Sequence, residues 1–213
     1  MTEATWPAWP ELFDRSLGAY LGLALGDALG ATVEFMTPRE IAHQFAHQGG
    51  VHRHIVGGGW LKLAPGQVTD DTTMSLALGD ALLRAQAGGR PFDTRTMADA
   101  FVAWWRAKPV DCGHTCQRGI ARYLREGTLQ GPCNEGDGGN GAAMRNLPVV
   151  LATLQDDEAF ARVSLAQARI THHQAHSDAA TLGLGRLLRL LLAGGATPAA
   201  AAWAERWVAA NPA

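Results

Sequence analysis

The sequence predicts an all-α protein with a single domain. Apolar residues recur every three or four positions along most of the chain, which is the period of an amphipathic helix. Glycine pairs or a proline end several of these stretches, as they commonly end helices. No stretch alternates apolar and polar residues convincingly enough to predict a sheet. The 213 residues suffice for one sizeable core and not clearly for two.

The first helix is expected over residues 14–29. Its apolar face is formed by Leu17, Leu21, Ala24, Leu25 and Ala28. Its glycines, Gly18, Gly22, Gly26 and Gly30, recur at every fourth position and form a stripe. Glycine weakens a helix by about 1 kcal/mol relative to alanine. We therefore expect another helix or a ligand to approach this stripe closely, and close helix packing alone would explain it.

Further helices are expected at 71–87 and 96–108, with shorter ones at 115–125 and 142–154. The first two carry inward faces made of Met74, Leu78, Ala81 and Leu82, and of Met97, Phe101, Trp104 and Trp105. A helix after Ser177 would face inward with Ala180, Leu184, Leu187, Leu188 and Leu191. The last helix would start at the cap Thr197 and run to about Ala210.

Composition and charge exclude several classes of protein. Hydrophobic residues at 47% and charged residues at 18% are typical of a globular chain. A net charge of −2 without a basic patch argues against nucleic acid as a partner. No apolar run is long enough for a transmembrane helix. The chain start lacks a secretion signal, and three cysteines are an odd count, so we expect a cytoplasmic location.

Carboxylates and hydroxyls gather in two segments. Asp27 and Glu34 lie near the end of the first helix, and Thr69, Asp70 and Asp71 lie where the next helix starts. Each acidic residue alone is explained as well by a helix cap. Together they form an oxygen-only set, which suits Mg²⁺ or Mn²⁺ and not zinc. Cys112, His114 and Cys116 lack an evident fourth ligand for zinc.

A glycine-rich segment at 136–141 leads into the expected helix at 142–154. Free amides at a helix start, with glycines that permit close approach, can form an anion site. A surface turn explains the same composition, and both interpretations stay open here.

Four ordered segments together resemble the ADP-ribosylglycohydrolase family. They are residues 26–35 (GDALGATVEF), 66–72 (GQVTDDT), 139–145 (GNGAAMR) and 171–179 (THHQAHSDA). The resemblance covers the chain from about residue 14 to its end. Within the family, residues 37–41 (TPREI), 57–63 (GGGWLKL) and 145–148 (RNLP) look most like the branch that reactivates the nitrogenase iron protein.

This resemblance implies a compact helical bundle and metal-dependent hydrolysis. The bond would be the N-glycosidic bond between ADP-ribose and a protein arginine. Thr69, Asp70 and Asp71 would bind two Mn²⁺ or Mg²⁺ ions. Glu34, beside the metals, and Asp137, which would act on the ribose, would be the catalytic residues.

The resemblance also implies a binding site for the ADP-ribose group. Asn140, Gly141 and Arg145 would hold the diphosphate and the loop around it, and His172 would line the pocket. The substrate protein would be ADP-ribosylated nitrogenase iron protein, and nitrogen-regulatory proteins would be further partners.

The chain departs from the family at its C-terminal end. Family members carry a second metal motif there, Asp-x-Asp-Thr, and after Asp178 the only acidic side chain here is Glu205. We therefore expect residues 1–213 to form one domain that is C-terminally incomplete, lacks the last helices, exposes an apolar patch and catalyses poorly.

Two alternatives remain beside the arginine hydrolase. The first is a catalytically incomplete module that binds ADP-ribose or regulates a partner. The second is an enzyme that acts on ADP-ribose linked to serine or to nucleic acid, which the match at residues 57–63 disfavours.

Overall fold

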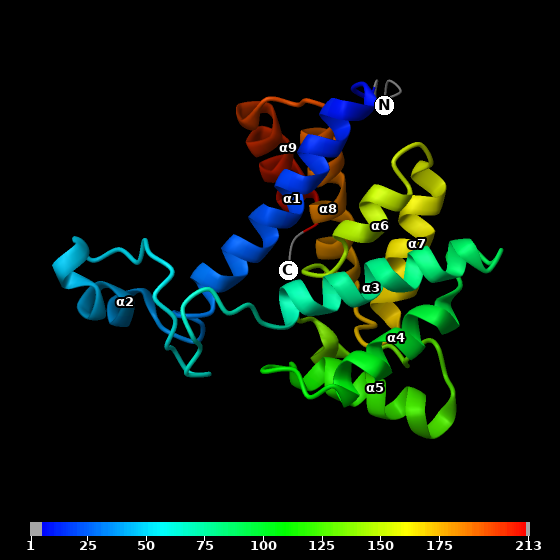
Figure 1. Ribbon diagram of the computed structural model, residues 1–213, viewed down its shortest axis with the longest axis horizontal. Helices are drawn as coiled ribbons and strands as arrows, with labels where there is room; N and C mark the ends of the chain where they lie inside the picture. Colours follow the sequence, from blue (N-terminus) through cyan, green and yellow to red (C-terminus); the bar gives the residue numbers. More distant parts are fainter. Residues whose placement is uncertain (1–5, 212–213) are drawn as a thin grey trace.

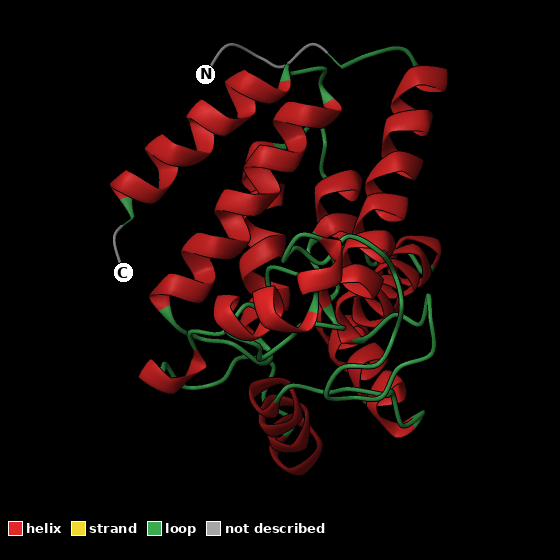
Figure 2. Ribbon diagram, turned by 90° about the vertical axis from the view of Figure 1, so that its left-hand side faces the viewer, coloured by secondary structure: helices red, strands yellow, loops and turns green. Residues whose placement is uncertain are grey.

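The computed structural model describes residues 6–211, and its regular elements are helices. The α-helices are α1 (Trp9–Gly30), α2 (Pro38–Gln44), α3 (Asp70–Ala87), α4 (Thr94–Arg106), α5 (His114–Glu126), α6 (Leu147–Ala152), α7 (Asp157–Arg169), α8 (Ala175–Leu192) and α9 (Thr197–Ala210). Two short 3-10 helices cover Ala46–Gln48 and Glu135–Asp137. Figure 2 shows helices and loops only, so the all-α prediction is confirmed for this part of the chain.

Helix α3 lies at the centre of the arrangement. It packs against α1, α4 and α6, while α8 packs against α6, α7 and α9. Helix α2 and the loops around it project to one side of the bundle (Figure 1). In the described residues no helix is both long and apolar enough to cross a membrane.

The main core joins helices α3, α4 and α5 to α6 and α7. Its fully buried members include Met74, Leu78, Met97, Phe101, Ile120, Val149 and Val163. The predicted inward faces of the helices at 71–87 and 96–108 are therefore confirmed. Asp93 caps α4 by accepting a hydrogen bond from the amide of Thr96 at 3.0 Å, which fixes where that helix begins.

The predicted inward face of α8 is wrong for Ala180, Leu184 and Leu191, which are exposed, and holds for Leu188, which packs against a buried cluster. Leu184 and Leu191 are each 39% exposed, whereas the buried side of the helix carries Gly183 and Gly185. A Cβ atom at Gly185 would lie 2.6 Å from the ring of Phe160. At these positions the neighbouring helices approach so closely that only glycine fits, whereas Leu188 and Leu192 pack against a second buried cluster.

The close helix packing predicted for the glycine stripe on α1 is also wrong. A Cβ atom at any of its four glycines would meet nothing within 4 Å among the described residues. On the same helix Leu17, Leu21 and Leu25 are 48%, 55% and 58% exposed. The helix exists as expected, but its leucines and glycines face outward.

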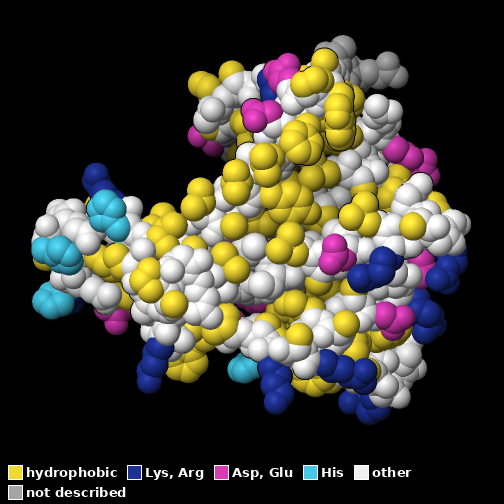
Figure 3. All heavy atoms as spheres, in the orientation of Figure 1, with side chains coloured by type: hydrophobic (Ala, Val, Ile, Leu, Met, Phe, Trp, Pro, Cys, Tyr) yellow, Lys and Arg dark blue, Asp and Glu magenta, His cyan; other side chains and the backbone are white. Residues whose placement is uncertain are grey.

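This outward face confirms the expected apolar patch. Figure 3 shows hydrophobic side chains along the course of α1. The large exposed ones are Trp9, Phe13, Leu17, Leu21 and Leu25, and we call them the α1 apolar face. Such a continuous apolar surface is unusual on a soluble monomer.

Two helices were not predicted, and one was predicted too long. Helix α7 starts after Asp156, which accepts a hydrogen bond from the amide of Ala159 at 2.8 Å. Helix α2 starts with a capping box between Thr37 and Glu40. The helix expected at 142–154 is only α6 (Leu147–Ala152), and the residues before it form turns.

Candidate active site

The carboxylate of Asp27, near the end of α1, organises the start of α3. It accepts hydrogen bonds from the backbone amides of Thr69 at 2.9 Å and Thr72 at 3.1 Å. It also accepts from their hydroxyl groups, at 2.8 Å and 2.6 Å. Asp27 thus caps α3 from another helix, because it accepts from backbone amides at the start of α3. Thr69 also gives its hydroxyl proton to this carboxylate, which leaves the lone pairs of the hydroxyl oxygen free.

The acidic residues predicted for metal binding lie together beside this cap. Burial and the charges of Asp70, Asp27 and Glu34 raise the pKa of Asp71 to about 7. Burial, followed by the charges of Asp111, Asp70 and Asp27, raises the pKa of Glu34. Mutual repulsion of this kind is typical of carboxylates that share a site built for a cation.

Asp111 belongs to the same cluster and was missed in the sequence. After burial, its charge is the main cause that raises the pKa of Asp70. It follows α4 in a loop without a motif of its own, so only the fold reveals its position. Asp27 was noticed as a carboxylate, but its role as the cap of α3 was not.

The oxygen atoms of these residues are of the type that binds a hard divalent cation, but too few of the side chains converge to form a complete site. Thr69, Asp70, Asp71 and Glu34 offer hydroxyl and carboxylate oxygens only, the ligands that Mn²⁺ and Mg²⁺ prefer. Within residues 6–211, however, no three His, Cys, Asp or Glu side chains converge closely enough to hold a metal ion.

The start of α5 connects the acidic cluster to the glycine-rich segment. The amide of Gly113 lies 3.4 Å from the carboxylate of Asp70. One turn further on, the thiol of Cys116 lies 3.6 Å from the guanidinium of Arg145. The acidic cluster and the region of Arg145 therefore lie on either side of the short segment 113–116.

Arg145 is fully buried, at 0% exposure. It donates hydrogen bonds to Gln167 Oε1 at 2.8 Å, to the Gln167 carbonyl at 2.9 Å and to Thr171 Oγ1 at 2.8 Å. Its guanidinium lies 4.2 Å from the ring centroid of Phe101. Groups of the protein itself therefore satisfy the hydrogen-bond donors of this side chain, and these partners lie in α7 and just after it.

The glycine-rich segment does not start a helix. Residues 141–145 form turns, and the carbonyl of Asn140 accepts hydrogen bonds from the amides of Ala143 at 2.9 Å and Met144 at 3.1 Å. The segment is therefore a turn and not a helix start, and the amides of Ala143 and Met144 have an acceptor within it. Asn140 itself is exposed, whereas Gly141 is buried.

His172 lies against this segment. A Cβ atom at Gly141 would lie 2.6 Å from Cε1 and 2.9 Å from Nε2 of the imidazole. The ring is 2% exposed, and burial, followed by the charges of Arg145 and Arg118, lowers its pKa to about 3. The structure thus brings together Gly141 and His172, two residues that the resemblance assigns to substrate binding.

Asp137 is placed differently from the other predicted catalytic residue, Glu34. Its buried carboxylate forms an ion pair with Arg118 of α5. Glu34 is exposed, and its negative charge is one of those that, after burial, raise the pKa of Asp71. The two predicted catalytic carboxylates therefore have different electrostatic partners, a cation for one and anions for the other.

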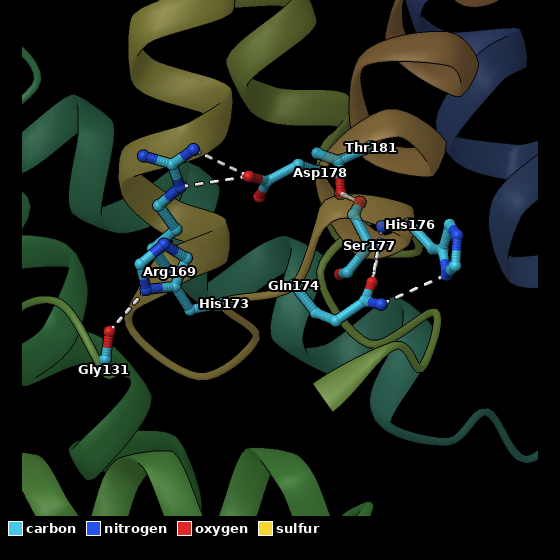
Figure 4. A network of polar contacts seen from close by, with 8 residues as sticks. All are labelled: Gly131, Arg169, His173, Gln174, His176, Ser177, Asp178 and Thr181. Carbon is cyan, nitrogen blue, oxygen red and sulfur yellow. Dashed lines mark hydrogen bonds and ion pairs between the residues drawn. The ribbon is translucent and has the colours of Figure 1, made fainter. Parts of the chain in front are cut away.

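The segment after His172 is fixed by polar contacts at the start of α8 (Figure 4). Arg169, at the end of α7, pairs with Asp178 at 2.7 Å. Gln174 caps α8 by accepting a hydrogen bond from the amide of Ser177 at 3.3 Å. His173 Nδ1 lies 2.6 Å from the carbonyl of Gly131. These contacts hold the loop that carries His172 in one conformation.

A model of the ADP-ribosylglycohydrolase family matches residues 8–212. The chain belongs to this family. As a member, it is 55% identical over 185 residues to the ADP-ribosyl-[dinitrogen reductase] glycohydrolase of Rhodospirillum rubrum. It is 35% identical over 171 residues to the ADP-ribosylarginine hydrolase Tri1 of Pseudomonas putida (strain GB-1).

The fold of this family member also matches a solved structure. That structure, an ADP-ribosylglycohydrolase-related protein complex, superimposes with a TM-score of 0.72 at 33% sequence identity. It matches 96% of the present chain and 65% of its own. The sequence alignment with the Rhodospirillum rubrum protein covers 87% of this chain and 60% of that protein. The alignment with Tri1 covers 76% of this chain and 43% of Tri1. The chain thus spans between two fifths and two thirds of the length of these three proteins.

Proposed function

We propose that this protein hydrolyses the N-glycosidic bond between ADP-ribose and a protein arginine. The observation that carries the proposal is the 55% identity to a glycohydrolase named for ADP-ribosylated dinitrogen reductase. The geometry supports it, because an acidic, oxygen-only cluster lies across one short segment from a glycine-rich loop with a buried imidazole. The substrate would then be the nitrogenase iron protein in a cytoplasmic setting, with nitrogen-regulatory proteins as further partners.

The reaction requires a water molecule and a proton acceptor. The C1–N bond of the ribose breaks, a C1–O bond forms with water, the departing guanidino nitrogen gains one proton and the water loses one. The transition state resembles an oxocarbenium ion. Glu34 is the exposed carboxylate of the cluster, and partial burial together with the neighbouring charges raises its pKa, which favours a proton that it can give to the departing nitrogen.

The proposal includes one or two Mn²⁺ or Mg²⁺ ions at Thr69, Asp70 and Asp71. A divalent cation there would orient the ribose hydroxyl groups and acidify a bound water. Asp27 supports these residues by fixing the start of α3. Asp137 and Asn140 keep their predicted roles in ribose chemistry and diphosphate binding.

The experiment is the release of free ADP-ribose from an ADP-ribosylated arginine substrate. The chain is assayed with Mn²⁺, then with Mg²⁺, and then with a chelator. Release that the chelator abolishes supports the proposal, and the variant Asp71→Asn should lose it. Release that persists unchanged with the chelator contradicts the metal part of the proposal.

A second function is favoured by one finding, the absence of three converging metal-ligand side chains in the described residues. Under this alternative the chain binds ADP-ribose without cleaving the bond. Saturable binding of ADP-ribose, measured by calorimetry, without release from the modified substrate would establish the alternative.

A further inference from the structure

Arg145 is a buried cation whose hydrogen-bond partners are all neutral among the described residues. Its guanidinium bonds to Gln167 and to Thr171, and no carboxylate forms an ion pair with it there. Burial lowers its pKa, but an arginine keeps its charge inside a protein. The positive charge of Arg145 therefore acts at short range on the groups that contact Thr171.

Thr171 connects this cation to the imidazole of His172. Its hydroxyl oxygen accepts from Arg145 Nη2 at 2.8 Å and lies 2.8 Å from His172 Nδ1. The hydroxyl has one proton, and its acceptors in reach are the imidazole nitrogen and the thiol of Cys116. Sulfur is the weaker acceptor, so the proton belongs on the side of the imidazole.

The charge of Arg145 also selects the proton position on the ring. A proton on Nδ1 would direct an N–H dipole toward the guanidinium, whereas a lone pair there is attracted by it. The ring is neutral, since the pKa of His172 is lowered to about 3. A neutral imidazole carries one proton, and with Nδ1 as an acceptor this proton must be on Nε2.

Nε2 belongs to the edge of the ring that faces the glycine-rich segment, beside Cε1, which lies 2.6 Å from the Cβ position of Gly141. Nε2 itself lies 3.5 Å from the Cβ position of Gly139 and 2.9 Å from that of Gly141. A Cβ atom at Gly141 would crowd this edge of the ring, whereas one at Gly139 would be in ordinary contact with it, so the glycine at 141 lets the imidazole pack directly against the segment.

We propose that Arg145, acting through Thr171, holds His172 in the Nε2–H tautomer, so that His172 donates a hydrogen bond to an oxygen of the ADP-ribose group at residues 139–141. His172 is then a neutral donor and not a proton donor in catalysis. Arg145 and Thr171 are positioning residues, because they act through the imidazole. The identity of the ligand rests on the proposed function, whereas the tautomer does not.

The first test is a measurement of both tautomers by NMR with ¹⁵N-labelled histidine at pH 7. His172 should show its proton on Nε2 alone. His173 is an internal reference of opposite kind, since the carbonyl of Gly131 at 2.6 Å can only accept and requires a proton on Nδ1 (Figure 4). A proton on Nδ1 of His172 in the unmodified chain overturns the proposal.

The second test removes the hydroxyl. Thr171→Val should give His172 a measurable share of the Nδ1–H form, and Thr171→Ser should restore the single tautomer. His173 should keep its tautomer in both variants, which separates this effect from a general loss of structure. An unchanged single Nε2–H tautomer in Thr171→Val overturns the role of Thr171.

The third test concerns the ligand, with free ADP-ribose as the probe. The amide of glutamine can place an N–H near the position of Nε2, and that of asparagine near Nδ1. His172→Gln should therefore stay within a few-fold of the unmodified affinity, and His172→Asn should lose about tenfold or more. Equal losses in both variants overturn the donor role. If the unmodified chain binds no ADP-ribose, the proposed function fails while the tautomer result stands.

Discussion

At the scale of single residues, Asp27 shows how one carboxylate can position a site without belonging to its reactive part. Four donors from Thr69 and Thr72 converge on it from the start of α3. Hydrogen bonds to a charged acceptor stabilise more than those between neutral groups, and donors left without an acceptor destabilise further.

We expect Asp27→Ala to lower the free energy of unfolding by about 2–4 kcal/mol, because two amides and two hydroxyls lose their acceptor. Urea denaturation followed by circular dichroism measures this loss. Asp14→Ala, at an exposed position of the same helix, should change the free energy by less than about 0.5 kcal/mol. Similar values for the two variants would contradict the capping role.

His172 predicts a dependence of stability on pH. Its pKa is about 3 in the folded protein against an ordinary value of 6.5. Between these values the unfolded chain binds a proton that the folded chain does not. The stabilisation is therefore complete above about pH 6.5 and decreases as the pH falls toward 3, by up to about 1.4 kcal/mol per pH unit.

Denaturation curves at pH 7, 6, 5 and 4 measure this dependence. His172→Gln should flatten it, because glutamine does not titrate. His54→Gln, at an exposed position, should keep the slope of the unmodified chain. An equally steep slope in His172→Gln would show that other groups cause the loss.

At the scale of helices, glycines decide which faces come into contact. Gly119 in α5 lies under the segment that carries Thr171, and a Cβ atom there would lie 2.5 Å from Thr171 Cα. Gly22 in α1 has nothing within 4 Å of its Cβ position. The same residue type is thus a requirement of packing in one helix and a weakness in another.

The two alanine variants should therefore have opposite signs. Gly119→Ala should destabilise by more than about 1 kcal/mol, because backbone atoms must move to admit the methyl group. Gly22→Ala should stabilise by about 0.5–1 kcal/mol through helix propensity. Thermal unfolding of both variants measures the signs, and a destabilised Gly22→Ala would mean that a partner covers that stripe in solution.

At the scale of the whole molecule, the α1 apolar face exposes five large hydrophobic side chains along one helix. Its large side chains are between 48% and 72% exposed. The chain spans 60% of the Rhodospirillum rubrum protein it matches, so the comparison is with a longer molecule. An apolar surface of this kind attracts dyes and other apolar surfaces.

We expect the double substitution Leu21→Gln with Leu25→Gln to reduce binding of a hydrophobic dye, without lowering the unfolding midpoint in urea. The reason is that both leucines are more than half exposed and contribute little to the core. Leu78→Gln, at a position with 0% exposure, should lower the midpoint strongly. Unchanged dye fluorescence in the double variant would place the apolar surface elsewhere.

The sequence by itself determined the fold class, the core faces of α3 and α4, and the family. These follow from local periodicity and from motifs whose residues lie close together along the chain, such as residues 66–72. Helix α7 was missed although Asp156 caps it, because the pattern was not recognised as a helix start.

Only the tertiary structure decided which side of α1 and of α8 is buried. Amphipathic spacing marks an apolar face, but contact depends on how closely neighbouring helices approach, as at Gly185 against Phe160. The roles of Asp27, Asp111 and Arg145 likewise depend on partners far away in the sequence. Hydrogen bonding and charge act over a few ångströms in space, and the order of residues along the chain does not record those distances.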